Sequence, residues 1–216
     1  MRLSGRQINF PDPRQADEDG LVAVGADLSA ERLITAYRSG IFPWTVKPVT
    51  WWSPDPRGIF ELGQLHVSRS LARAIRRAPF QVTHDQAFRQ VMEGCAAPAD
   101  GRRDTWISPE FIEAYTRLHQ LGFAHSFECW QETKLVGGIY GVAVGGLFAG
   151  ESMFHLASDA SKIALYHLHE HLVRQDFELF DIQMVTPITA QLGAVQIPRS
   201  AYLKRLADAV KKERSF

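Results

Sequence analysis

The spacing of apolar positions along the chain predicts six helices. In the first of them, Leu33, Ile34 and Tyr37 recur at the interval that places side chains on one face of a helix. Ser29 can cap its amino end and Gly40 can end it. The six predicted helical segments are 27–40, 68–78, 85–96, 108–122, 158–176 and 197–213.

Apolar and β-branched runs without helical spacing predict strands between these helices. Gly145 and Gly146 interrupt the longest run, which indicates two antiparallel strands joined by a turn. Just after the first run, Asp85 is placed to cap the following helix, and the polar segment 97–105 is expected to form a loop. The predicted strand segments are 80–84, 124–131, 134–154 and 177–185.

The composition and the predicted secondary structure of the chain change near residue 60. Before that point the chain is rich in Pro, Gly and Trp, and Pro54 and Pro56 favour an extended or turning path. After it, helices alternate with strands. We therefore predict an α+β fold with a small domain over 1–60 and a larger domain over 61–216. The order of elements in the larger part is similar to that of acyltransferase domains, with a mixed, mostly antiparallel sheet covered by helices.

The strand at 177–185 carries two polar residues in an apolar run. Because side chains alternate between faces of a strand, Asp181 and Gln183 are expected to share one face, with Phe180, Ile182 and Met184 on the other. A buried carboxylate is costly unless it has a partner. Either the pair forms hydrogen bonds at the end of a sheet, or it faces a cleft and does chemistry.

Composition narrows the choice of function. The 216 residues are 45% apolar and 22% charged with a formal net charge of zero, so any nucleic-acid contact must come from a local basic patch. Two cysteines, no signal-peptide pattern at the amino end and no apolar run of membrane-spanning length indicate the cytoplasm. The nearest metal-like pair, His167 and His171, has no further ligand nearby, and we expect no metal and no cofactor.

Ten short strings, in order over nearly the whole chain, resemble the bacterial leucyl/phenylalanyl-tRNA–protein transferase family. The resemblance implies an acetyltransferase-like (GNAT-like) larger domain and a monomeric enzyme. The implied activity moves Leu, Phe or Met from aminoacyl-tRNA to the α-amine of proteins that begin with Arg or Lys, marking them for degradation. The strings are GLVAVGADLS, AYRSGIFPW, WWSPDPR, HVSRSL, TWI, LVGGIYGV, GESMF, ASK, FDIQ and LGAVQIPR.

The resemblance places Asp181 and Gln183 at the catalytic centre. Gln183 cannot titrate, but its amide oxygen can accept a hydrogen bond from the attacking amine, and Asp181 can accept one from the Gln183 amide nitrogen or orient it. The chain departs from the family after FDIQ, where Thr186, Pro187 and Ile188 replace a polar residue and a following His.

Candidate binding residues follow from the chemistry of the donor. Trp44 and Trp106 offer stacking faces for the terminal adenine, and Glu151 can contact the donor amine or can be a surface carboxylate. Residues for an apolar side-chain pocket, which can equally be plain core, are Ile139, Phe148, Met153, Leu165, Leu168 and Phe180. The basic stripe of 68–78, a candidate tRNA contact or a solvated face, consists of Arg69, Arg73, Arg76 and Arg77.

Two other functions remain open on the sequence alone. An acyl-CoA N-acetyltransferase would need a pyrophosphate-binding loop, and QLGAVQIP, the nearest stretch, lacks the spacing. A non-catalytic module that binds tRNA or degradation signals would keep the Arg and Trp residues without needing Asp181 and Gln183.

Overall fold

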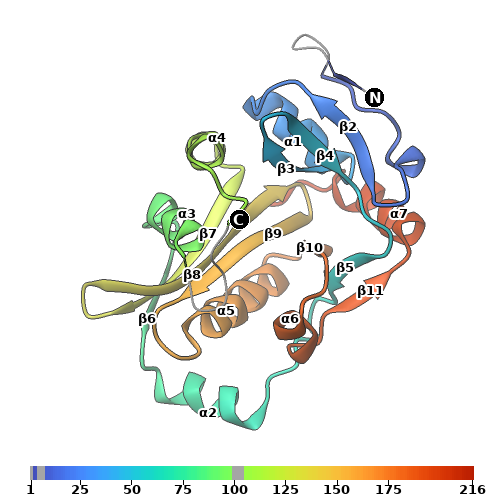
Figure 1. Ribbon diagram of the computed structural model, residues 1–216. Helices are drawn as coiled ribbons and strands as arrows, with labels where there is room; N and C mark the ends of the chain where they lie inside the picture. The colour runs from blue at the N-terminus through green and yellow to red at the C-terminus, as the bar shows by residue number, and fades with distance from the viewer. Residues whose placement is uncertain (1, 4–7, 99–104) are drawn as a thin grey trace.

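A computed structural model of the chain, which describes residues 2–3, 8–98 and 105–216, contains two sheets with helices packed around them (Figure 1). Most of the polar segment 97–105 lies outside the described residues. The smaller sheet has the order β1-β2-β4-β3 and consists of β1 (Arg2–Leu3), β2 (Leu21–Gly25), β3 (Phe42–Val46) and β4 (Val49–Trp52). The larger has the order β11-β5-β10-β9-β8-β7-β6 and consists of β5 (Arg57–Phe60), β6 (Gln81–His84), β7 (Ala124–Gln131), β8 (Lys134–Val144), β9 (Leu147–His155), β10 (Leu179–Gln183) and β11 (Val195–Ile197).

The helices confirm the α+β class and all six predicted helical segments. They are α1 (Ala30–Arg38), α2 (Arg69–Arg77), α3 (Phe88–Ala96), α4 (Pro109–Gln120), α5 (Ala160–Arg174), α6 (Pro187–Gln191) and α7 (Arg199–Ala209), with a short 3₁₀ turn, η1 (Pro13–Gln15). The expected cap of α3 is wrong, because this helix begins at Phe88 after Ala87. The carboxylate of Asp85 instead accepts a hydrogen bond from the backbone N–H of Ser126 at 2.9 Å.

The central strands β7, β8 and β9 form the predicted antiparallel meander. The turn between β8 and β9 falls at Gly145 and Gly146, and Gly145 has φ of +60°, which favours glycine. Strand β10 runs parallel to β9 on the other side, but its register pairs only Leu179 to Asp181 with Leu147 to Ala149. The carboxyl-terminal half of β9 therefore has no β10 partner.

The two faces of the larger sheet carry separate hydrophobic cores. Along β8, Tyr140 and Val142 belong to the core under α1, α3, α4 and α7, whereas Ile139 and Ala143 belong to the core under α5. This alternation is the two-residue period of a strand buried on both faces. Among the described helices, none is long and apolar enough to span a membrane.

Candidate active site

Strand β10 changes its backbone conformation at Gln183. Its register with β5 shifts between Asp181, opposite Ile59, and Gln183, opposite Gly58, and Gln183 has a left-handed φ of +56°. Such a shift re-aims the side chains that follow it. As a result Ile182, Gln183 and Met184 all line one cavity. The expected alternation, with Ile182 and Met184 on the opposite face from Gln183, is therefore wrong at the end of this strand.

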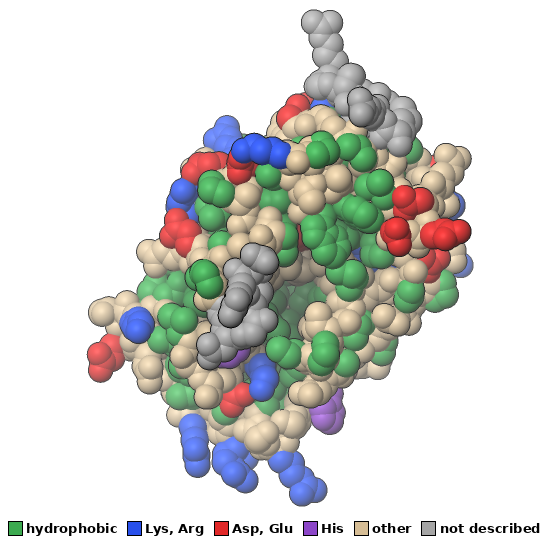
Figure 2. Space-filling model, viewed as in Figure 1, with side chains coloured by type: hydrophobic (Ala, Val, Ile, Leu, Met, Phe, Trp, Pro, Cys, Tyr) green, Lys and Arg blue, Asp and Glu red, His purple; other side chains and the backbone are tan. Residues whose placement is uncertain are grey.

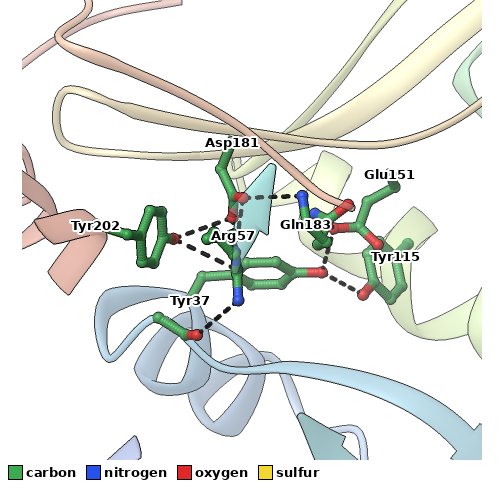
Figure 3. A network of polar contacts seen from close by, with 8 residues as sticks. Tyr37, Arg57, Tyr115, Glu151, Asp181, Gln183 and Tyr202 are labelled. Carbon is green, nitrogen blue, oxygen red and sulfur yellow. Dashed lines mark hydrogen bonds and ion pairs between the residues drawn. The ribbon is translucent and has the colours of Figure 1, made fainter. Parts of the chain in front are cut away.

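Asp181 is fully buried and its partner is Arg57 (Figure 3). The guanidinium donates from Nε to Oδ1 at 2.8 Å and from Nη2 to Oδ2 at 2.6 Å, and the Tyr202 hydroxyl donates to Oδ2 at 3.0 Å. Arg57 also donates to the carbonyl of Gly40 at 3.1 Å. This bidentate pair satisfies a carboxylate whose burial would otherwise be costly.

The contact between Asp181 and Gln183 differs from the expected one. Asp181 Oδ1 accepts a hydrogen bond from the backbone N–H of Gln183 at 2.9 Å, whereas the Gln183 side-chain Nε2 donates to Glu151 Oε1 at 3.1 Å. Asp181 thus fixes the backbone of Gln183, and Glu151 orients its amide (Figure 3). Within the described part of the chain, no group donates a hydrogen bond to Gln183 Oε1 or to Glu151 Oε2.

Glu151 is the centre of a second cluster of hydrogen-bonded side chains, next to the one around Asp181. The Tyr37 hydroxyl donates to its Oε1 at 2.8 Å, and Tyr37 and Tyr115 hydroxyls are 2.5 Å apart. Burial raises the pKa of Glu151 to about 8, against the opposing effects of the Tyr37 hydrogen bond and the Arg57 charge, and the Asp181 charge raises it further. A carboxyl group with this pKa can exist in both protonation states near neutral pH.

Two cavities meet at Glu151. The first, of about 290 Å³, is called here the Trp cavity and is lined by Phe42, Pro43, Trp44, Trp106, Glu151, Ile182, Gln183, Met184 and Thr186. The second, of about 540 Å³, is called the apolar cavity and is lined by Phe60, Ile139, Gly150, Glu151, Ser152, Met153, Leu165, Ile182, Met184, Thr186, Pro187, Ile188 and Thr189. Figure 2 shows this face of the molecule hollowed and bordered by hydrophobic side chains.

The structure brings together most of the residues expected to bind the donor. Trp44, Trp106 and Glu151 lie with Gln183 in the Trp cavity. Ile139, Met153 and Leu165 line the apolar cavity, which also contacts Glu151.

Three expected pocket residues lie behind the cavities instead of lining them. Phe148, Leu168 and Phe180 are each no more than 1% exposed and belong to the core under α5. The Phe180 ring packs against Phe148 and against Phe60, with centroid distances of 5.6 and 5.3 Å. Phe60 itself lines the apolar cavity, so these residues support its wall.

The four arginines of α2 are exposed and line neither cavity. Ser68 caps this helix by accepting from the backbone N–H of Leu71 at 3.2 Å. No ion pair joins these arginines to any residue that the structure describes. In Figure 2, Lys and Arg side chains gather at the lower edge, where α2 lies in Figure 1. Their contact with nucleic acid stays a prediction.

Residue-level reasoning missed several members of the site, although the sequence contained a signal for some of them. Arg57 and Tyr37 lie inside the strings WWSPDPR and AYRSGIFPW, but nothing in the sequence alone assigned either of them to the site. Tyr115 and Tyr202 occupy helices and have no local pattern that separates them from core tyrosines.

A metal centre and a reactive Cys129 thiol are two other possible sites, and the described residues support neither of them. They contain no group of three or more His, Cys, Asp or Glu arranged to hold a metal ion. Burial, followed by the charge of Glu128, raises the pKa of the Cys129 thiol to about 12, which removes it as a nucleophile near neutral pH.

Comparison with known proteins identifies similar chains. The family model described as "Leucyl/phenylalanyl-tRNA protein transferase" matches residues 59–207, and the model for the N-terminal domain of that family matches 26–55. A leucyl/phenylalanyl-tRNA–protein transferase from Anaeromyxobacter sp. (strain Fw109-5) is 54% identical over 208 residues, which cover 95% of this chain and 88% of the relative. Relatives of the same name from Magnetococcus marinus and Shewanella woodyi are 51% and 48% identical, covering 97% and 92% of this chain and 92% and 87% of their own lengths.

Proposed function

The chain belongs to the leucyl/phenylalanyl-tRNA protein transferase family, and we propose that it moves Leu, Phe or Met from tRNA to the α-amine of proteins that begin with Arg or Lys. It is an aminoacyltransferase whose substrates are an aminoacyl-tRNA and a protein amino terminus. The new terminal residue marks the acceptor for degradation. The protein acts as a monomer in the cytoplasm, where both substrates occur, and it needs no cofactor.

The observation that carries the proposal is the junction of the two cavities at Glu151, whose carboxylate accepts a hydrogen bond from Gln183 of the Trp cavity. A Leu, Phe or Met side chain requires an apolar site, and Ile139, Met153 and Leu165 provide one. The terminal adenosine stacks on Trp44 and Trp106, since aromatic side chains contribute about 1–3 kcal/mol for each stacked base. These two placements bring the ester carbonyl to the junction.

At the junction, Gln183 receives the attacking amine. Its Nε2 is held by Glu151, which leaves Oε1 to accept a hydrogen bond from the amine and aim the nitrogen lone pair at the carbonyl. Positioning of this kind can contribute roughly 7–11 kcal/mol to lowering the barrier. Asp181, held by Arg57, is a positioning residue because it fixes the Gln183 backbone without facing the junction.

Glu151 is the one titratable group among the described residues that line the Trp cavity. When deprotonated, it accepts the proton that the amine loses as the C–N bond forms and the ester C–O bond breaks. Glu151 then passes this same proton to the departing ribose oxygen, so that it returns to its deprotonated state. In its charged state Glu151 can also hold the ammonium group of the donor amino acid. Peptide formation from an ester is downhill, so the reaction balances without a nucleotide.

We also infer that 1–60 form a small domain and 61–216 a GNAT-like catalytic domain. The sheets support a division into two domains, since the strands of the smaller sheet end at Trp52 and those of the larger sheet begin at Arg57. Because β5 (Arg57–Phe60) belongs to the larger sheet, this division falls between Trp52 and Arg57, a few residues before the expected boundary at 60. The short pairing of β9 with β10 further supports a sheet opened to admit an acyl donor.

Transfer assays test the proposed activity against its rivals. We expect label from Leu-tRNA to appear on a peptide that begins with Arg, and none on the same peptide with an acetylated α-amine. Acetylation from acetyl-CoA would instead support an N-acetyltransferase. Binding of tRNA without transfer to any peptide would support a non-catalytic module.

A further inference from the structure

A third cavity adjoins the Trp cavity. It has a volume of about 350 Å³ and is called here the Asp19 cavity. It shares Phe42, Trp44 and Met184 with the Trp cavity, so the two cavities are adjacent. Its lining consists of Asp19, Phe42, Trp44, Thr45, Trp52, Pro54 and Met184.

The backbone around Asp19 is fixed to the neighbouring strand connection. Asp17 Oδ1 accepts hydrogen bonds from the backbone N–H groups of Asp19 at 3.1 Å and Leu21 at 2.8 Å. Gly20 has φ of +95°, its carbonyl accepts from the Ser53 N–H at 2.7 Å, and a Cβ there would lie 2.8 Å from Pro54 Cα. The loop therefore holds Asp19 at the cavity edge, and only glycine fits the position next to it.

The lining of this cavity is suited to a cation. The rings of Trp44 and Trp52 meet at 63° with centroids 6.0 Å apart, and they form an aromatic corner beside the Asp19 carboxylate. A guanidinium or ammonium group is attracted both by aromatic faces and by a carboxylate. Among the residues described, none forms an ion pair or hydrogen bond with the Asp19 side chain, so its charge is available to a ligand.

The charge around the cavity argues against a phosphate in it. Asp17, Glu18 and Asp19 follow one another in the loop before β2. Acidic side chains gather at the right of Figure 2, over the place where this loop lies in Figure 1, whereas the basic edge formed by α2 is at the bottom. The tRNA backbone is therefore favoured at α2 and repelled from the Asp19 cavity.

We propose that the Asp19 cavity binds the cationic side chain of the acceptor's first residue while its α-amine lies at Gln183. This inference rests on the proposed transfer reaction and identifies how that reaction selects Arg or Lys. Of the described residues that line the three adjoining cavities, only Glu151 and Asp19 carry carboxylates. Glu151 is engaged at the junction by Gln183 and Tyr37, which leaves Asp19 for the side chain.

The assignment of Asp19 to the acceptor side chain is tested by comparing acceptor peptides whose first side chain is charged or uncharged. The kcat/KM for transfer from Phe-tRNA is measured with two otherwise identical peptides that begin with Lys or with norleucine, whose side chain is similar in shape but uncharged. In Asp19→Asn the preference for Lys should fall by about fivefold, mostly through KM, as expected for a partly exposed ion pair combined with cation–π contact. Transfer to the norleucine peptide should stay unchanged.

Glu18→Gln is the matched control, because Glu18 is the exposed acidic neighbour of Asp19 and does not line the cavity. It should keep the wild-type preference for Lys. An Asp19→Asn protein with the wild-type melting temperature and an undiminished preference for Lys would overturn the assignment. Equal loss with both peptides would also overturn it, because Asp19 would then act on the structure. Failure of the wild-type protein to transfer to any peptide would instead overturn the proposed function.

Discussion

At the scale of single residues, the proposed reaction depends on how Gln183 is held. A left-handed φ is uncommon for a residue other than glycine, and here the Asp181 carboxylate stabilises it by accepting the Gln183 N–H. The side chain is then held by Glu151, whose pKa of about 8 is close to the 7.7–8.0 typical of an α-amine. The proton donor and the proton acceptor of the proposed reaction are therefore matched.

Glu151→Gln should change the pH dependence of transfer. In the wild-type protein both Glu151 and the acceptor α-amine must lose a proton, so log kcat/KM should rise with a slope of about 2 below pH 7.5. The Gln variant keeps an acceptor for Tyr37 but has no titrating carboxyl, and its slope should fall to about 1. Initial rates of transfer from a stable minimal donor between pH 6 and 9 measure this.

The pH dependence of thermal unfolding tests the raised pKa of Glu151 independently of the transfer rate. The pKa of Glu151 is raised from 4.5 in the unfolded chain to about 8 in the folded protein, so the folded state binds more protons between these values. Stability must therefore fall as pH rises through this window, and the fall should be smaller in Glu151→Gln. If Glu151→Gln showed the same pH dependence as the wild-type protein, both in log kcat/KM and in stability, Glu151 would be excluded as the proton acceptor.

Asp181→Asn should act mainly on stability. It leaves the Arg57 guanidinium buried without its charge partner, and breaking a buried pair in this way costs about 3–5 kcal/mol. For a chain of this size the melting temperature should fall by about 10 °C. Glu61→Gln, which breaks a partly exposed bidentate pair with Arg205, is the control and should cost about 1 kcal/mol or less. If calorimetry gave the same loss of stability for Asp181→Asn and Glu61→Gln, the structural role of the buried pair would be contradicted.

At the scale of elements, the site is formed where β9 and β10 stop pairing after Ala149 and Asp181. Periodicity predicted the six long helices and the β7–β9 meander, because their patterns are local. It could not predict α6 or β11, which are too short to show a period, nor the strand order, which depends on contacts distant in sequence. The bulge at Gln183 was missed for the same reason, since the register with β5 creates it.

Truncation should have different effects at Phe148, which is buried in the core packed against α5, and at Leu165, which lies on α5 and lines the apolar cavity. Phe148→Ala removes a fully buried ring from the core and should destabilise the protein by about 3–5 kcal/mol. Leu165→Ala shortens a residue that lines the apolar cavity and should also raise KM for Leu-tRNA severalfold. Chemical denaturation and steady-state kinetics of both variants measure this. A larger KM effect for Phe148→Ala than for Leu165→Ala would place Phe148 in the substrate site.

At the scale of the whole molecule, the net charge is zero, but basic and acidic side chains lie at different edges of one face. The exposed arginines of α2 occupy one edge and the acidic loop before β2 another, with the cavities between them (Figure 2). The sequence predicted the basic stripe from its helical spacing. It could not predict that the acidic loop borders a cavity, because residues 19, 44 and 184 meet only in the folded chain.

Charge reversal on α2 should separate tRNA binding from chemistry. Arg73→Glu together with Arg76→Glu should weaken the binding of aminoacyl-tRNA and flatten its salt dependence, since each lost phosphate contact lowers the slope by about 0.7–0.9. Transfer from phenylalanyl-adenosine, which lacks the tRNA backbone, should stay close to wild type. Binding measured at several salt concentrations checks the first part, and an equal loss with the minimal donor would make the stripe structural.

The central claim is that transfer occurs at the junction of the two cavities with Gln183 holding the acceptor amine. Its most direct test is the single-turnover rate of Phe transfer from phenylalanyl-adenosine to a peptide that begins with Arg, with both substrates saturating. Gln183→Ala should lower this rate by about 10²- to 10³-fold, while its melting temperature moves by no more than a few degrees. A folded Gln183→Ala protein that transfers Phe at the wild-type rate would contradict the claim.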